Sequence, residues 1–249
     1  MRLRYITCSD PRENLNPKDV IDLLKISPLA ELGVQAHPSA MSFGCPRFDW
    51  LKKLLDMAKD LQTPINLALH VNYKWCDKIC MGKIPGEIKF FLNKRHSITH
   101  KPLIARIQLN IGDGTYEFYP QNLSNVICGM QQDYEFIFPF NNRVKKRIEL
   151  LPRKSKFNLL FDGSYGAGIP PEKWEKPAYD NRQFGYAGGL SPDNVYENLN
   201  KISNILPKDY ETWIDAEGQL RDIYTGSFNL DLARNYLTNA IEWNNQNCK

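Results

Sequence analysis

Short apolar runs alternate with longer amphipathic stretches along almost the whole chain, and this order constrains the fold more than any other feature. Strand character occurs at residues 3–8, 31–36, 65–71, 103–110, 134–138, 157–162, 184–187 and 211–215. Helical periodicity follows most of these runs, at 17–25, 47–61, 73–93, 122–130, 142–150, 192–205 and 230–243, and a short helix is expected from Pro170. Eight strand-then-helix units predict an α/β fold, a single-domain (β/α)8 TIM barrel over residues 1–249.

An open doubly wound sheet is the alternative arrangement for alternating strands and helices. That fold expects a glycine-rich phosphate-binding turn after the first strand. The corresponding turn here is Ser9-Asp10-Pro11, so the barrel is favoured. The length of 249 residues is also typical of a barrel.

Charge and cysteine usage narrow the class of protein. The net charge of +4 comes from 32 basic and 28 acidic residues that are scattered along the chain, which argues against nucleic-acid binding. With no signal segment and no long apolar span, a cytoplasmic protein without membrane contact is expected. His96 and His100, like Cys76 and Cys80, are four residues apart but lack further ligands, so no metal site is expected.

Function in a TIM barrel lies at the carboxyl ends of the strands. The residues at these positions are Cys8, His37, His70, Asn72, Asn110, Asp162, Gly188, Gly189, Asp215 and Gly218. Asp162 is the most informative, because its apolar strand runs directly into a loop with Gly166 and Gly168. Such a loop is typical of one that closes over a substrate, and an ordinary turn that begins at an Asp is the alternative.

Several of these strand ends resemble phosphoribosylanthranilate isomerase, the barrel enzyme of tryptophan biosynthesis. The segment Ala187-Gly188-Gly189-Leu190-Ser191-Pro192-Asp193-Asn194-Val195 is close to Ala-Gly-Gly-Leu-Thr-Pro-Glu-Asn-Val of that family. Cys8 lies where the family has its first-strand cysteine, Cys45-Pro46-Arg47-Phe48 resembles Ser-Pro-Arg-Tyr, and Leu160-Phe161-Asp162 resembles Leu-Leu-Asp. The chain is therefore similar to a diverged member of the barrels that bind sugar phosphates.

The resemblance implies a cofactor-independent Amadori-type isomerisation of a phosphorylated aminosugar, in which a proton moves from C2 to C1. It implies that Asp162 is the general acid and that Cys8 is the general base. His70 is a further candidate, because a rim histidine can shuttle protons near neutral pH. Binding of the substrate and its phosphate is expected at Arg47, Gly166, Gly168, Gly188, Gly189, Asp215 and Gly218. The expected partner is this small molecule, and the chain is expected to be a monomer or a homodimer.

The eighth strand departs from the family pattern. Ile214-Asp215-Ala216-Glu217-Gly218 stands where the family has Val-Asp-Val-Ser-Ser-Gly, and the Glu217 carboxylate would repel a phosphate. Two alternatives therefore remain open. One is a barrel isomerase or lyase that acts on another sugar or carbonyl compound, with His70 recruited. The other is a non-catalytic ligand-binding barrel, which predicts that Cys8 and Asp162 do not face a shared pocket.

Overall fold

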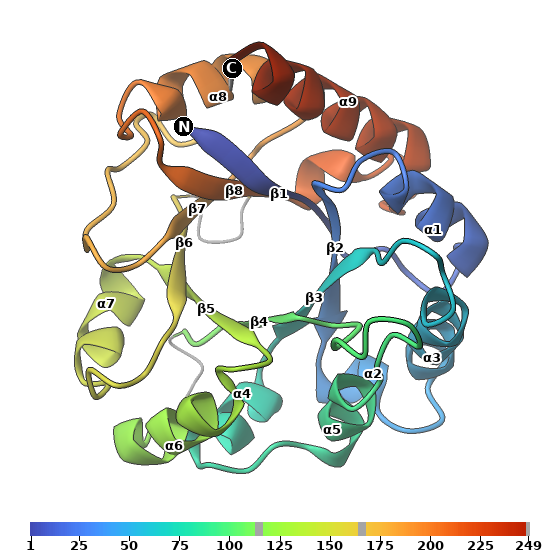
Figure 1. The fold of residues 1–249 in the computed structure, drawn as a ribbon, viewed down its shortest axis with the longest axis vertical. Helices are drawn as coiled ribbons and strands as arrows, with labels where there is room; N and C mark the ends of the chain where they lie inside the picture. The colour runs from blue at the N-terminus through green and yellow to red at the C-terminus, as the bar shows by residue number, and fades with distance from the viewer. Residues whose placement is uncertain (113–116, 164–167, 248–249) are drawn as a thin grey trace.

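The computed structural model describes residues 1–112, 117–163 and 168–247. Eight parallel strands pair in sequence order and close into a barrel, with β8 beside β1 (Figure 1). They are β1 (Arg2–Ser9), β2 (Ala30–Ala36), β3 (Asn66–Val71), β4 (Arg106–Leu109), β5 (Glu135–Phe140), β6 (Asn158–Asp162), β7 (Phe184–Ala187) and β8 (Glu211–Ala216). The predicted TIM barrel is confirmed, and each predicted strand overlaps an observed one.

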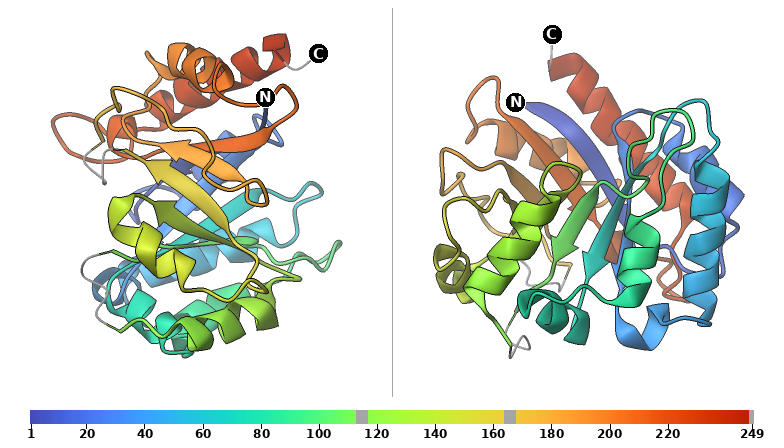
Figure 2. Two further views of the ribbon diagram at one scale, coloured as in Figure 1. Left: turned by 90° about the vertical axis from the view of Figure 1, so that its left-hand side faces the viewer. Right: turned by 60° about the horizontal axis from the view of Figure 1, so that its bottom comes forward.

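Helices surround the barrel on its outside (Figure 1; Figure 2). They are α1 (Pro17–Leu24), α2 (Pro38–Met41), α3 (Pro46–Ala58), α4 (Lys74–Cys80), α5 (Gly86–Leu92), α6 (Pro120–Met130), α7 (Asn142–Glu149), α8 (Val195–Ser203) and α9 (Leu230–Asn247), with a 3₁₀ turn η1 (Gly218–Leu220). The start of α1 illustrates the local signals, because the Asn16 side chain accepts from the Lys18 amide and Pro17 is the first helical residue. Of the described helices, none combines the length and apolarity needed to cross a bilayer.

The short helix predicted from Pro170 is wrong. Residues 168–183 contain no helix between β6 and β7. Pro171 disfavours the α conformation at Pro170, and neither proline has an amide hydrogen to donate. The described part of this connection is therefore an irregular segment, and it packs against the rim at Gly189.

Alternation along β1 separates the two faces of the barrel wall. Thr7 Oγ1 donates to Glu31 at 2.7 Å and Ser9 Oγ donates to Asp215 at 2.6 Å, both inside the barrel. Cys8, between them, is fully buried in the main apolar core. Because Thr7 and Ser9 on either side of it face the interior, the alternation of the strand turns the Cys8 side chain outward, toward the helices.

A buried ion pair closes the floor of the barrel below the site. Arg106 Nη1 donates to Glu31 Oε1 at 2.6 Å, and both side chains are almost completely buried. The guanidinium group also lies 4.4 Å from the ring centre of Tyr5 and 4.6 Å from that of Trp213. Above this layer, Trp213 packs with Ile137 and Leu160 in a small apolar cluster that separates the floor from the rim.

Candidate active site

A cavity of about 830 Å³ opens at the carboxyl ends of the strands. Residues at the ends of the eight strands or directly after them line it, because parallel strands all end at the same rim. The sequence-predicted residues among them are Arg47, His70, Asp162, Gly168, Gly188, Gly189, Asp215 and Gly218. Cys8 is not part of the wall, and Gly166 lies outside the described residues.

Of the three described non-glycine residues with positive φ, two lie at the edge of this cavity and the third, His100, lies elsewhere. Asp10, directly after β1, has φ 62°, and Tyr73, two residues after β3, has φ 54°. Both line the cavity. A left-handed backbone costs about 1–3 kcal/mol at a non-glycine residue, and such residues gather at functional sites. The strain is therefore an argument for function that is independent of the sequence resemblance.

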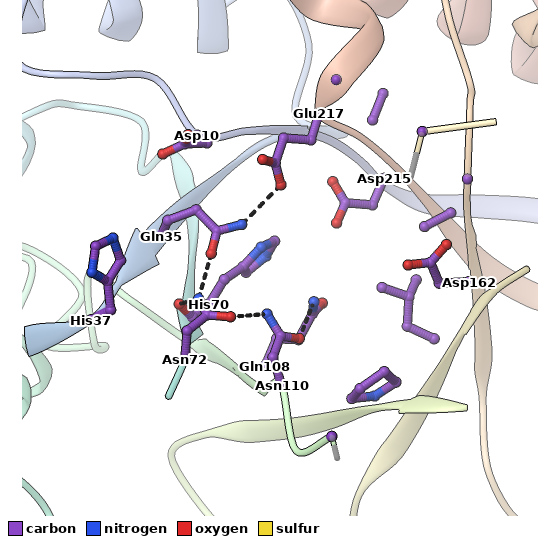
Figure 3. Close-up of a pocket in the computed structure, with 18 of the residues that line it drawn as sticks. Asp10, Gln35, His37, His70, Asn72, Gln108, Asn110, Asp162, Asp215 and Glu217 are labelled. Atoms are coloured by element: carbon purple, nitrogen blue, oxygen red, sulfur yellow. Dashed lines mark hydrogen bonds between the residues drawn. The ribbon is translucent and has the colours of Figure 1, made fainter. Parts of the chain in front are cut away.

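Asp162 on β6 and Asp215 on β8 stand at the same height on the barrel wall. Each is in register with Ala187 of β7, so the two residues are two strands apart. Adjacent strands are about 4.8 Å apart, which places the two backbones within about 10 Å of each other. Both side chains line the cavity on the same side (Figure 3).

The environment of Asp215 tunes it for proton transfer. Burial raises the pKa of Asp215 to about 6, and the charge of Asp162 acts in the same direction. The hydrogen bond from Ser9 and the charge of Arg106 favour the ionised form and limit the shift. Asp215 therefore changes its protonation state close to neutral pH, where a general acid or base is most effective.

A directed relay of side-chain hydrogen bonds crosses the opposite side of the rim (Figure 3). Gln108 Nε2 donates to Asn110, Asn110 Nδ2 donates to Asn72, and each of these bonds is 2.9 Å long. Asn72 Nδ2 donates to Gln35, whose Nε2 donates to Glu217 Oε2 at 2.9 Å. Four amide side chains on or directly after β4, β3 and β2 thus end at one carboxylate that follows β8.

Glu217 brings a third carboxylate close to Asp215. Burial raises the pKa of Glu217, and the charges of Asp10 and Asp215 contribute to the same rise. Arg221 Nη2 lies 3.4 Å from the other Glu217 oxygen and also contacts Asp10. Where the family resemblance predicts a phosphate, the rim therefore holds the Glu217 carboxylate, which is paired with Arg221.

His70, at the end of β3, is buried and lines the cavity. Burial lowers its pKa to about 4, so the imidazole is neutral at physiological pH. Gly33 on β2 makes the space for it, because a Cβ at Gly33 would lie 2.5 Å from His70 Cε1 and 2.3 Å from Ser9 Oγ. A neutral His70 can take part in hydrogen bonding but does not supply a positive charge.

Arg47 lines the cavity, and its guanidinium group already binds two carboxylates. Its Nη1 donates to Asp10 at 3.0 Å and its Nε donates to Glu13 at 3.1 Å. Arg12 also pairs with Asp10, at 3.3 Å, so both cationic side chains on the described wall already have carboxylate partners. Arg47 is expected from the sequence to bind the substrate, and in this geometry two of its nitrogen atoms already donate to carboxylates of the chain itself.

The fold does not place Cys8 and Asp162 in the same cavity, because Asp162 lines it and Cys8 does not. Burial raises the pKa of the Cys8 thiol well above its usual value, and the charge of Asp215 adds to the rise. A general base needs the opposite shift, since the thiolate is the reactive form. Cys8 is therefore corrected from a catalytic base to a core residue, because the strand points its side chain away from the cavity.

Gly168, Gly189 and Gly218 at the rim differ in what surrounds them. Gly189 has φ 63°, and a Cβ there would lie 2.2 Å from the Pro170 nitrogen, so the segment after Gly168 can pack closely over it. The Gly168 carbonyl accepts from Gln219 Nε2 at 3.0 Å, which joins the β6–β7 and β8–α9 connections. Gly218 has open space around it.

Sequence reasoning missed Asp10, Gln35, Gln108 and Glu217 as positive members of the site. Gln35 and Gln108 each lie two residues before a position recognised from the sequence, His37 and Asn110. A strict period of two, applied from the strand end, would have found them. Among residues 1–112, 117–163 and 168–247, no three His, Cys, Asp or Glu side chains form a group that could hold a metal ion.

The geometry thus defines a polar cavity with an acidic pair on one side and an amide relay on the other. The chain matches no protein-family model and no curated protein.

Proposed function

We propose that this protein is a cofactor-independent isomerase that moves a proton between adjacent carbons of a small sugar-type substrate, as phosphoribosylanthranilate isomerase does. The observation that carries the proposal is the pair Asp162 and Asp215, held at one height on either side of Ala187. The pKa of about 6 for Asp215 supports a role in exchanging protons near neutral pH.

The pair accounts for every proton in an Amadori-type rearrangement. Asp162 gives a proton to the ring oxygen, the bond between C1 and that oxygen breaks, and the nitrogen lone pair forms a C=N bond. Asp215 then removes the C2 proton, which leaves an enaminol. Asp162 takes the proton of the C2 hydroxyl group as the ketone forms, and Asp215 returns its proton to C1. Both groups end in their starting states.

Asp215 takes the role that the resemblance gives to Cys8. Its neighbour Ser9 donates to one carboxylate oxygen and holds the side chain against the wall. A carboxylate with a raised pKa is a stronger base than an ordinary one, and after burial the charge of Asp162 adds to the rise in the pKa of Asp215.

Turnover in D₂O tests the proposal. Purified protein is incubated with aldoses, aminoaldoses and phosphoribosylanthranilate, and loss of the C2 proton and formation of ketose are followed by NMR. Asp162→Asn and Asp215→Asn should each lower the rate by about 10²-fold or more. Cys8→Ala is the matched control and should retain the rate. Absence of exchange across the panel, or an Asp215→Asn enzyme with full activity, would sink the proposal.

A non-catalytic ligand-binding barrel is the second candidate, and the burial of Cys8 favours it. That alternative predicts that Cys8 and Asp162 do not share a pocket, as is the case in the described geometry. It is distinguished by binding of a sugar-type ligand without any exchange of the C2 proton.

A further inference from the structure

Carboxylates on the described part of the cavity wall oppose the phosphate that the family resemblance predicts. The described wall carries the carboxylates of Asp10, Asp162, Asp215 and Glu217 and the guanidinium groups of Arg12 and Arg47. Both arginines pair with Asp10, and Arg221, which is not among the residues that line the cavity, pairs with Asp10 and Glu217. A phosphate at the end of β8 would therefore meet Glu217 and Asp215 without an uncommitted cation on the described wall, and juxtaposed like charges weaken binding strongly.

Glu217 determines which end of each amide side chain in the relay donates a hydrogen bond and which end accepts one. An ionised carboxylate only accepts, so Gln35 must turn its NH₂ group toward Glu217 and its carbonyl toward Asn72. For the same reason, Asn72 turns its NH₂ group toward Gln35, and Asn110 turns its NH₂ group toward the Asn72 carbonyl. Among the described residues, one N–H each of Gln35, Gln108 and Asn110 then has no protein partner. The rim therefore offers amide donors beside carboxylate acceptors.

We infer that this cavity selects a polyhydroxylated substrate without a phosphate group, and that Glu217 with its amide relay is the element that excludes the phosphate. A hydroxyl group both donates and accepts, so vicinal hydroxyls match a wall on which amide N–H groups and carboxylates alternate. A phosphate monoester accepts but hardly donates near neutral pH, and it would face Glu217 directly. The inference rests on the proposed function only in taking this cavity as the substrate site.

Binding measurements with matched sugars test the inference. The probes are ribose with ribose 5-phosphate and glucosamine with glucosamine 6-phosphate, and affinities are measured by ligand-observed NMR and calorimetry on the whole chain. Each unphosphorylated sugar should bind at least about tenfold more tightly than its phosphate ester, a ratio equivalent to about 1.4 kcal/mol. Equal or tighter binding of the esters overturns the inference, and so does a failure of both pairs to bind.

Two substitutions assign the effect to Glu217. Glu217→Gln keeps an acceptor for Gln35 and removes the charge, whereas Glu217→Ser also makes room for a phosphate. Discrimination against the esters should fall by about tenfold or more in Glu217→Ser and by a smaller factor in Glu217→Gln. The exposed Glu197→Gln on α8 removes the same charge far from the cavity and should leave the discrimination unchanged. Discrimination that persists in both Glu217 variants overturns the assignment.

The two proposals fail in different ways. Selective binding of unphosphorylated sugars without exchange of the C2 proton refutes the isomerase and leaves the selectivity standing. Turnover that requires a phosphorylated sugar refutes the selectivity and leaves the isomerase standing. Thermal unfolding of each variant establishes that a lost signal is not a lost fold.

Discussion

At the scale of single residues, one position along a strand decides what a side chain meets. Thr7 is in register with Asp215, and the next residue, Cys8, is in register with Ala216. Thr7 and Asp215 face the barrel interior, whereas Cys8 faces the helices. The carboxylate is therefore available for proton transfer, and the thiol one step away is held neutral by its apolar surroundings.

Asp215→Asn should stabilise the folded protein at pH 8 and not at pH 4. The folded pKa of about 6 exceeds the ordinary value of about 3.9, so folding binds the proton more tightly. The stability from this group is fully present below about pH 4 and is lost as the pH rises through about 6. Removing the charge should therefore recover up to about 3 kcal/mol at pH 8, as measured by urea unfolding.

The difference between the two pH values is the diagnostic quantity, because it reports the net free-energy cost of the buried charge after the hydrogen bond from Ser9 to the carboxylate has offset part of it. Asp193→Asn, on an exposed side chain, is the control and should change stability equally little at pH 4 and pH 8. An equal effect of Asp215→Asn at both pH values would show that the charge of Asp215 does not destabilise the folded protein.

At the scale of secondary-structure elements, the short strand β7 fits between its neighbours only because it carries Gly185. A Cβ at this position would lie 2.1 Å from Cε2 of Trp213 on β8, inside the barrel. The indole ring is rigid and packed against Ile137 and Leu160, so it has no free direction in which to move.

Gly185→Ala is expected to destabilise the protein by about 1–3 kcal/mol or more, because overpacking forces strain into a filled core. Gly129→Ala in α6 is the matched control. Its Cβ would meet nothing within 4 Å, and a helical alanine is favoured over glycine by about 0.5–1 kcal/mol. Chemical denaturation of both variants checks the opposite signs. A neutral Gly185→Ala would mean that Trp213 can repack.

The sequence predicts the elements well because their signals are local. Apolar strands and capped helices can be recognised one at a time, as with Asn16 and Pro17 at the start of α1. The helix expected from Pro170 failed where the periodicity was weakest and where Pro171 opposes it. The site was harder to predict, because the partners of Arg47 are Asp10 and Glu13, more than thirty positions away. Such pairing depends on how the loops fold over the rim.

At the scale of the whole molecule, the barrel surrounds a polar interior rather than a purely apolar one. Arg106 joins Glu31 and Glu135 across β4, β2 and β5 beneath the apolar cluster. Within the described residues, Glu31 Oε2 and Arg106 Nη2 are buried without a hydrogen-bond partner. Removal of either Arg106 or Glu31 alone is therefore expected to destabilise the fold strongly.

Arg106→Met should destabilise the fold by about 3–5 kcal/mol, because it leaves the Glu31 charge buried without its counter-ion. Adding Glu31→Gln should restore at least about 1 kcal/mol, because the glutamine amide can still accept from Thr7 and carries no charge. Urea unfolding of wild type, both single variants and the double variant completes the cycle. If the effects of Arg106→Met and Glu31→Gln on the free energy of unfolding simply added, the two side chains would not be energetically coupled.

The seam between β1 and β8 has a consequence for how the protein acquires its function. Ser9 reaches Asp215 across 206 positions of sequence, and Arg221 reaches Asp10 across 211. Contacts between such distant positions form slowly, since a long loop must close before they contribute. An incomplete chain that ends before β8 has most of the barrel but neither Asp215 nor Glu217. The ability to bind a ligand in this cavity should therefore arise last in folding, when the ring closes, and it can serve as a kinetic reporter of that closure.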